Sequence, residues 1–356
     1  MNLDLQSVPL QSDSMMVTSD PDELFALSFT EKWGDGMPFI PPTDKRIEVM
    51  LKGTPRLPSD IVVAEVPPRH GTATVELVAI NAVMAGCLPH HLPLVIAALE
   101  GIGEQAYNGF GLGTTTGPVA SFVLVNGPTR DTMEINYRAG CLGGATGRGS
   151  TTVGRAVQLC LRNIGGMSVG ESSRTVWGSP ARLGICFGEW EERSEWPSLA
   201  MRRGFTRDQE VVTVHGSMGT HPLTDVSTAN DRELVYLIAK SIASPMGNIF
   251  VPLLTHGEVI ICINPMWAAR FCNTFPTVEL FQECAFDSCW QPIEFFPKLN
   301  QGYLYENNRV DGKGRVHGLS SPDRIVPVIA GGLGNLHATI LPSWGESEMQ
   351  SKSTVR

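Results

Sequence analysis

Short runs of consecutive apolar residues, rich in valine and isoleucine, alternate along the chain with longer segments that carry apolar residues at helical spacing. Apolar runs of four to eight residues bounded by turn residues are typical of buried strands. The sequence therefore predicts strands at residues 61–66, 121–125, 182–187, 210–214, 258–263 and 324–330.

The segments between these runs repeat apolar residues every three or four positions, which is the period of a helix with one buried face. In the first of them, Val75, Val78, Ala79 and Ala82 share one face. Strands that alternate with helices indicate an α/β fold in which at least part of the sheet is parallel. Helices are predicted at residues 74–85, 92–104, 151–163, 231–243 and 276–285.

Four of the predicted strands run directly into turns of polar residues, glycine or proline. Ligands of open α/β sheets bind at the carboxyl ends of the strands, so polar residues at these positions are candidates for a site. The alternative is that Asn-Pro and Gly-Pro are simply common turn dipeptides. The candidates at the strand ends are Asn126, Glu189, Asn264, Gly332 and His337.

The same strand-and-turn unit recurs in both halves of the chain, which favours two similarly built lobes that face a shared cleft. The sequence places the first lobe at residues 21–205 and the second at residues 206–345. Residues 1–20 and 346–356 are rich in Ser, Asp, Glu and Lys and poor in apolar residues. Both ends are therefore expected to be frayed tails.

A glycine-rich segment at residues 140–156 leads into the start of a predicted helix. Glycines such as Gly144 let the main chain approach a ligand, and unpaired N–H groups at a helix start attract anions. Ser150 and Thr151 can cap the helix, while Arg148 and Arg155 add positive charge. The segment predicts a site for a small anion, and the alternative is a mobile surface loop before a capped helix.

Cys87, His90 and His91 lie in the turn between two predicted helices. A thiol close to a helix start and to imidazoles would have a lowered pKa and act as a nucleophile or acid, with one histidine as its proton partner. The structural alternative makes Cys87 a small apolar plug and both histidines turn residues.

A second group of candidates, Glu65, Arg69 and His70, follows the first predicted strand. The three side chains form a plausible wall of a site, although Glu65 on an edge strand would point to solvent. His215 lies at another strand end and, with His70, His221 and His256, would support a metal-assisted mechanism. No HExxH pattern or paired His/Cys spacing is present, so we expect no bound metal.

Glu189 follows a predicted buried strand and is the acidic residue of its segment expected to enter a site. Glu191, Glu192 and Glu195, which follow it, are expected to form a solvated face. The segment 331–337 contains glycines spaced like a dinucleotide fingerprint, but no strand-helix-strand unit follows it. We therefore expect no NAD, FAD or other cofactor.

The composition limits the class of partner. The chain has 356 residues and a formal net charge of -9, and its basic residues are scattered singly, which argues against nucleic acid or an anionic membrane. No apolar run is long enough to span a membrane, and the start lacks a secretory signal. The eight cysteines form no CxxC pair. These features predict a cytoplasmic protein with reduced thiols, and they are compatible with a homodimer.

Four segments, at residues 80–89, 154–156, 189–197 and 330–334, resemble an uncharacterised group of microbial proteins. Members of this group often occur beside UGSC-type thiol or selenol proteins. No reaction is established for the group, so the resemblance implies kinship in fold and site position over residues 60–340 and no activity. The group's histidine after Trp196 and Pro197 is absent, since residues 198–201 read Ser-Leu-Ala-Met.

Together these observations predict an enzyme that acts on a small organic anion such as a carboxylate. A lyase, dehydratase or hydrolase with a cysteine and histidine site fits best. The first alternative is a metal-dependent enzyme with a histidine site. The second is a protein that binds a small anion without catalysis.

Overall fold

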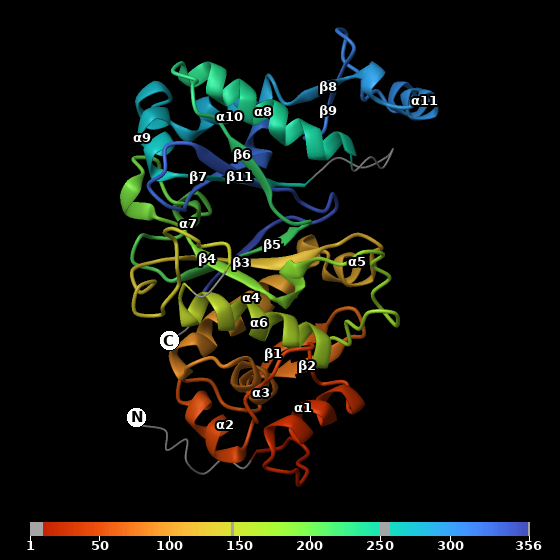
Figure 1. Cartoon of the computed structure of the whole chain (residues 1–356), viewed down its shortest axis with the longest axis vertical. Coiled ribbons are helices and arrows are strands. Elements are labelled where there is room, and N and C mark those ends of the chain that lie inside the picture. Colours follow the sequence, from red (N-terminus) through yellow and green to blue (C-terminus); the bar gives the residue numbers. More distant parts are fainter. Residues whose placement is uncertain (1–9, 144–145, 249–256, 355–356) are drawn as a thin grey trace.

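Two four-stranded mixed sheets pack face to face in the middle of the molecule, and helices cover the outer face of each sheet (Figure 1). The computed structural model describes residues 10–143, 146–248 and 257–354. This four-layer arrangement confirms the predicted α/β fold with mixed sheets.

The first sheet contains, in spatial order, β12 (Gln350–Ser353), β5 (Val211–Ser217), β3 (Ala120–Asn126) and β4 (Ile185–Gly188). Strands β3 and β4 are parallel, whereas β5 is antiparallel to β3 and to β12. Every residue of β3 and β5 is buried, because one face of the sheet meets helices and the other meets the second sheet.

The second sheet contains, in spatial order, β6 (His221–Thr224), β11 (His337–Leu341), β7 (Val259–Ile263) and β10 (Ile325–Ile329). Strands β7 and β10 are parallel, and β11 is antiparallel to β7 and to β6. The second sheet therefore has the same order of strand directions as the first.

Helices form the two outer layers. The first sheet is covered by α4 (Leu92–Ile102) and α6 (Arg148–Asn163), and α3 (Val75–Ala85) packs against these two helices. The second sheet is covered by α8 (Asp231–Asn248), α9 (Pro265–Thr274) and α10 (Val278–Phe286). The remaining elements surround these layers: α1 (Pro21–Thr30), α2 (Asp44–Leu51), β1 (Ile61–Val66), β2 (Gly71–Thr74), α5 (Gly109–Thr114), α7 (Leu199–Arg202), β8 (Trp290–Pro292), α11 (Lys298–Glu306) and β9 (Arg315–His317).

The alternation of side chains along the central strands builds three cores. In β3, Phe122 and Leu124 point toward the second sheet, while Val123 and Val125 contact the helices. In β7 the same alternation sends Ile260 and Cys262 toward the first sheet. The space between the sheets is therefore a packed core, where the sequence suggested a cleft.

Corresponding strands of the two sheets occur in the same order along the chain. In the first sheet the chain passes through β3, β4 and β5, with α6 between β3 and β4. In the second it passes through β7, β10 and β11, with α9, α10, β8, α11 and β9 between β7 and β10. Each half then sends its last strand to the other sheet, because β6 follows β5 and β12 follows β11. Reciprocal bonds join the crossing strands: Met218 N donates to Pro342 O at 2.9 Å and Trp344 N to Gly216 O at 3.0 Å. The two halves therefore have the same strand topology and exchange their last strands.

This exchange corrects the predicted boundaries. Strand β5 lies after residue 205 but belongs to the first sheet, so the division into 21–205 and 206–345 does not follow the sheets. The expected tail at 346–356 contains β12, which pairs with β5, and Met349 is buried. At the other end, the main-chain N–H groups of Gln11 and Ser12 donate to the Glu76 carboxylate, which anchors part of the expected tail at 1–20. Residues 1–9 lie outside the described residues.

The predicted strand at 61–66 is present as β1, but it is not a buried strand. It forms an antiparallel hairpin with β2, and only Val66 of its six residues is buried. A hairpin at the edge of the fold buries little apolar surface, and the apolar run alone did not distinguish it from a central strand.

Candidate functional site

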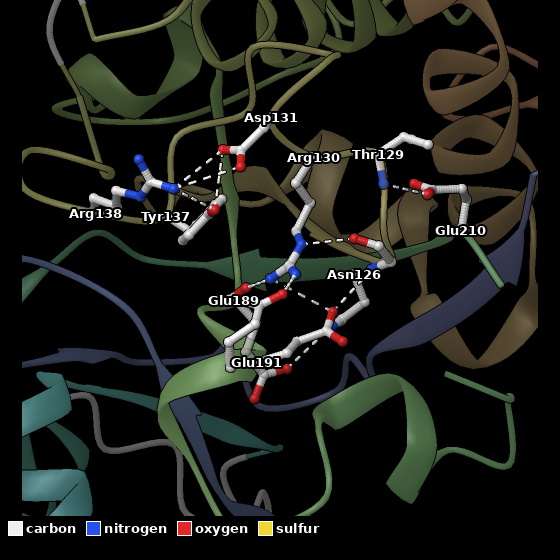
Figure 2. A network of polar contacts seen from close by, with 11 residues as sticks. Asn126, Thr129, Arg130, Asp131, Tyr137, Arg138, Glu189, Glu191 and Glu210 are labelled. Carbon is white, nitrogen blue, oxygen red and sulfur yellow. Dashed lines mark hydrogen bonds and ion pairs between the residues drawn. The ribbon is translucent and has the colours of Figure 1, made fainter. Parts of the chain in front are cut away.

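The ends of β3 and β4 carry a group of buried polar side chains, which we call the strand-end network: Asn126, Arg130, Glu189 and Glu191 (Figure 2). Because β3 and β4 are parallel, their carboxyl ends meet at the same edge of the sheet. Asn126 Nδ2 donates to Glu189 Oε2 at 2.8 Å and to Glu191 Oε1 at 2.9 Å. Two predicted site residues, Asn126 and Glu189, therefore lie in contact.

Arg130 lies between the acidic residues and is itself buried. Its Nε donates to Gly127 O at 2.7 Å, and its two terminal nitrogens donate to the Glu189 carbonyl oxygen and to Glu192 Oε1. Glu191 Oε1 lies 3.7 Å from the same guanidinium. Arg130 thus supplies the positive charge that lets several carboxylates gather at one strand end.

Glu189 is 3% exposed, and this burial raises the pKa of its carboxyl group. Arg202, the Asn126 amide and the main-chain N–H of Leu199, which donates to Glu189 Oε2 at 2.8 Å, act in the opposite direction. Asn126 Oδ1 is buried and has no hydrogen-bond partner among the described residues. A raised pKa makes this carboxylate a stronger base than an exposed glutamate, which is a property of groups that transfer protons in functional sites.

Aromatic rings and guanidinium groups form a stack beside the network. Arg130 and Arg138 lie 4.8 Å and 4.9 Å from the centre of the Tyr137 ring. Arg138 also lies 5.7 Å from the Trp190 ring, and Arg193 lies 5.4 Å from it. Such stacking fixes the plane of a guanidinium and leaves its edge available for hydrogen bonds.

The second half shows the same scaffold without the network. Glu189 N donates to Val125 O at 3.2 Å, and Ala330 N donates to Ile263 O at 3.0 Å, so Ala330 occupies the position equivalent to Glu189. Asn264, equivalent to Asn126, caps α9: its Oδ1 accepts from Met266 N and Trp267 N.

The other strand-end candidates, Gly332 and His337, do not touch the buried carboxylates. Gly332 approaches Ala139 in the loop after β3, and its neighbour Gly331 donates its N–H to Tyr137 O at 2.9 Å. The exposed His337 ring contacts Thr224 Oγ1 at 3.0 Å, and its carbonyl accepts from Asn264. The loop at 331–336 therefore packs against the loop that carries Tyr137.

The glycine-rich segment has a different role from the predicted anion site. Glu134 supplies a carboxylate oxygen to Arg148 N at 3.2 Å and its carbonyl to Ser150 N at 3.2 Å, so the chain itself satisfies the start of α6. A Cβ on Gly149 would lie 2.0 Å from Met133 O, so this glycine permits close packing. Gly144 lies outside the described residues.

The polar side chains of this segment also have partners within the chain. Ser150 Oγ accepts from Asn136 N at 2.7 Å, and Thr151 Oγ1 donates to Gly147 O. Arg155 forms a two-pronged ion pair with Asp35, at 2.7 Å and 2.9 Å, and Arg148 Nε donates to Gly86 O at 2.9 Å. In the described part of the segment, these polar groups are therefore used to hold the start of α6 against the rest of the chain.

Cys87 does not have the expected lowered pKa. Burial raises the pKa of its thiol to about 12, against the opposing influence of Thr152 and of the guanidinium groups of Arg148 and Arg155. The sequence placed the thiol correctly near a helix start, but it did not show that neighbouring apolar residues exclude water from it. A thiol in this state is a weak nucleophile.

His91 is fully buried, and burial followed by the neighbouring His90 lowers its pKa to about 4. Its Nδ1 accepts from Leu88 N at 3.1 Å, so Nε2 carries the proton and faces Met133 O at 3.0 Å. Both ring nitrogens are engaged in holding the turn. His90 is exposed and stacks edge-on against His91.

Glu65, Arg69 and His70 lie on the β1–β2 hairpin, away from the strand-end network. Arg69 N donates to Gly165 O, just past the carboxyl end of α6, whereas Arg148 lies at its start. Sixteen helical residues separate the two ends by about 24 Å. Arg69 pairs with Glu171 at 3.0 Å, and His70 Nδ1 lies 3.6 Å from Glu65 Oε2, all of them largely exposed. The hairpin candidates therefore share no site with the glycine-rich segment.

His215 lies between the sheets, with its Nε2 3.1 Å from Leu341 O, and burial lowers its pKa to about 4. This ring links β5 to β11 and is remote from solvent. In the described part of the chain, no three His, Cys, Asp or Glu side chains are grouped to hold a metal ion. Across the same residues, no helix has the length and apolar character needed to cross a membrane.

Sequence reasoning missed Arg130 and misplaced Glu191. The side chain of Glu191 is 8% exposed, whereas that of Glu192 is 57% exposed, so only part of the acidic segment forms the expected solvated face. The turn that follows β4 brings the Glu191 carboxylate back over the edge of the first sheet, where it contacts Asn126. The polar character of the loop after Asn126 was the one available signal for Arg130.

The chain matches no protein-family model, and no curated protein matches it. The resemblance to the microbial group stays a prediction.

Proposed function

We propose that this protein is an enzyme that moves a proton on a small organic anion, with Glu189 as the group that takes and returns the proton. The observation that carries the proposal is a comparison of the two strand ends, one in each half of the protein. The same strand end in the second half has Ala330 and is equally well formed, so the scaffold itself does not require a buried carboxylate. A costly buried charge that the fold does not need is typical of a functional site.

The chemistry fits a lyase or dehydratase. Burial raises the pKa of Glu189, which makes its carboxylate a stronger base toward a proton next to a carbonyl or carboxylate group. The exposed guanidinium of Arg138, stacked beside the network, would attract the anion. In an elimination, Glu189 takes the proton and the electron pair of that C–H bond forms the double bond as the C–O bond breaks. The leaving hydroxide then takes the same proton back from Glu189 and departs as water, which restores the carboxylate.

The other predicted mechanisms receive less support. A hydrolase that uses Cys87 with His91 would need an ionised thiol and a free imidazole, and burial opposes both. All eight cysteines are free thiols, which supports the proposal that the enzyme acts in the reducing cytoplasm.

Hydrogen exchange tests this proposal. The protein is incubated in D₂O with a panel of hydroxy, keto and unsaturated carboxylic acids, and proton NMR follows exchange or elimination. We expect the wild type to act on at least one acid, and Glu189→Gln to slow that reaction by about 100-fold or more while the fold is retained.

The matched control is Glu258→Gln. Glu258 is also buried, but it accepts from Met349 N and contacts Arg203 at the start of β7, so it should affect stability and leave the rate unchanged. Equal rates for all three proteins would contradict the role of Glu189. An acid that binds without exchange or elimination would favour the non-catalytic alternative.

A further inference from the structure

Trp190 lies directly after Glu189 and has two guanidinium groups close to its ring. Arg138 lies 5.7 Å and Arg193 lies 5.4 Å from the ring centre. Both arginine residues are exposed, so their charge is available at the surface beside the buried carboxylate. Two cations held beside one ring place two positive charges on this surface.

Neither arginine is fully used by the chain. Arg138 bonds through Nη2 to Tyr137 Oη at 2.8 Å, while its distances to Asp131 are 3.5 Å, which is long for an ion pair. Among the described residues, no carboxylate lies within ion-pair distance of Arg193. The nearby Glu192 is bonded to Arg130. Both guanidinium groups therefore keep donors for a ligand.

The spacing allows one short ligand to reach both guanidinium groups. Because each guanidinium carbon lies within 5.7 Å of the same ring centre, the two cannot be more than about 11 Å apart. A paired guanidinium and carboxylate place their carbon atoms about 4 Å apart. Two such pairs joined by a short carbon chain are therefore long enough to reach from one arginine to the other.

We propose that Arg138 and Arg193 together bind a short-chain dicarboxylate, one carboxylate to each guanidinium, at the mouth of the strand-end network. The location of this site rests on the proposed function, while the preference for two carboxylates rests on the two arginines alone. A dicarboxylate bound here has its carbon chain beside Trp190, which is adjacent in sequence to the proton-transferring group.

Binding of matched acids tests the inference. Isothermal titration calorimetry with succinate and with butyrate, which has a similar chain and one carboxylate, compares the wild type with Arg138→Gln and Arg193→Gln. We expect the wild type to bind succinate about tenfold or more tightly than butyrate at low salt. Arg193→Gln should remove this preference, and Arg138→Gln should weaken both acids.

Arg174→Gln is the control, because Arg174 is exposed and its guanidinium donates to Gly170 O at 3.2 Å within its own loop. It should bind succinate like the wild type. Equal affinity for the two acids, unchanged binding in Arg193→Gln, or no binding at millimolar concentrations would overturn the dicarboxylate site.

The binding and exchange experiments separate the two proposals. Glu189→Gln should still bind succinate, since the two guanidinium groups remain. Loss of exchange in Glu189→Gln without a succinate preference would overturn the dicarboxylate site and support the catalytic role. A succinate preference without any turnover would support the site and contradict the enzyme.

Discussion

Lowering the pH from 7 to 4 should reduce the free energy of unfolding by about 6 kcal/mol through His91 and His215 alone. Both rings are buried, and burial lowers each pKa from 6.5 to about 4. The unfolded chain therefore binds protons at pH values where the folded chain does not. The stabilisation is fully present above pH 6.5 and is lost as the pH falls toward 4.

Urea unfolding at several pH values measures this effect. His215→Leu removes one of the two groups, and leucine already occupies the equivalent position, Leu341, in the second half. Between pH 7 and pH 4, the free energy of unfolding of this variant should fall by about 3 kcal/mol less than that of the wild type, whatever its stability at pH 7. His90→Gln, which removes a neighbour that also lowers the pKa of His91, should reduce the decrease by less than His215→Leu does. A variant without His215 that follows the wild-type profile would show that this ring is not held neutral.

Replacing Gly149 with alanine should destabilise the protein by about 3 kcal/mol or more. Its added Cβ would lie 2.0 Å from the carbonyl oxygen of Met133 and 2.8 Å from Ile135 Cδ1. The obstacle is the main chain of the loop after β3, which packs against the start of α6, so the helix and this loop must separate. Thermal unfolding measures the loss.

Gly143 provides the matched control within the same segment. Apart from its chain neighbours, no described residue has an atom within 4 Å of the position a Cβ would take there, and its backbone needs no left-handed conformation. Gly143→Ala should therefore leave the free energy of unfolding within about 0.5 kcal/mol of the wild type. If the two variants were equally stable, the glycines would not serve to pack α6 against the loop.

The sequence predicted the central strands and helices well, because an element buried in the core has a run or a period of apolar residues in its own sequence. Strands β3, β7 and β10 are buried throughout, and each appears as an apolar run that ends close to the observed boundary. The expected helices correspond to α3, α4, α6, α8 and α10 for the same reason. The hairpin β1–β2 and strand β12 were misjudged, because pairing at an edge depends on a distant partner and not on local composition.

The candidate site was predicted in part. Asn126 and Glu189 lie in contact, as expected for residues at the carboxyl ends of neighbouring strands. The glycine-rich segment looked like an anion cradle because its own sequence does not reveal that Glu134 occupies the helix start. Likewise, the turn with Cys87 and His91 has the residues of a reactive site, and only the packing around it shows that water is excluded.

The exchange of edge strands lay beyond the sequence patterns. The turn after β5 and the turn after β11 read as ordinary connections, yet each carries the chain to the other sheet. The crossing is defined by Ser217 and Ser343, which pair across the two halves although 126 positions separate them. A contact between residues so far apart in the chain produces no periodic pattern of apolar residues around either of them.

The most direct test of the central claim is the titration of Glu189 by carbon NMR of labelled glutamate carboxyl groups, with Glu189→Gln used to assign its signal. We predict a pKa above the ordinary value of 4.5, raised further when succinate binds, because a nearby negative charge disfavours the carboxylate. A pKa at or below 4.5 that does not respond to succinate would contradict both the proton-transfer role of Glu189 and its place beside the anion.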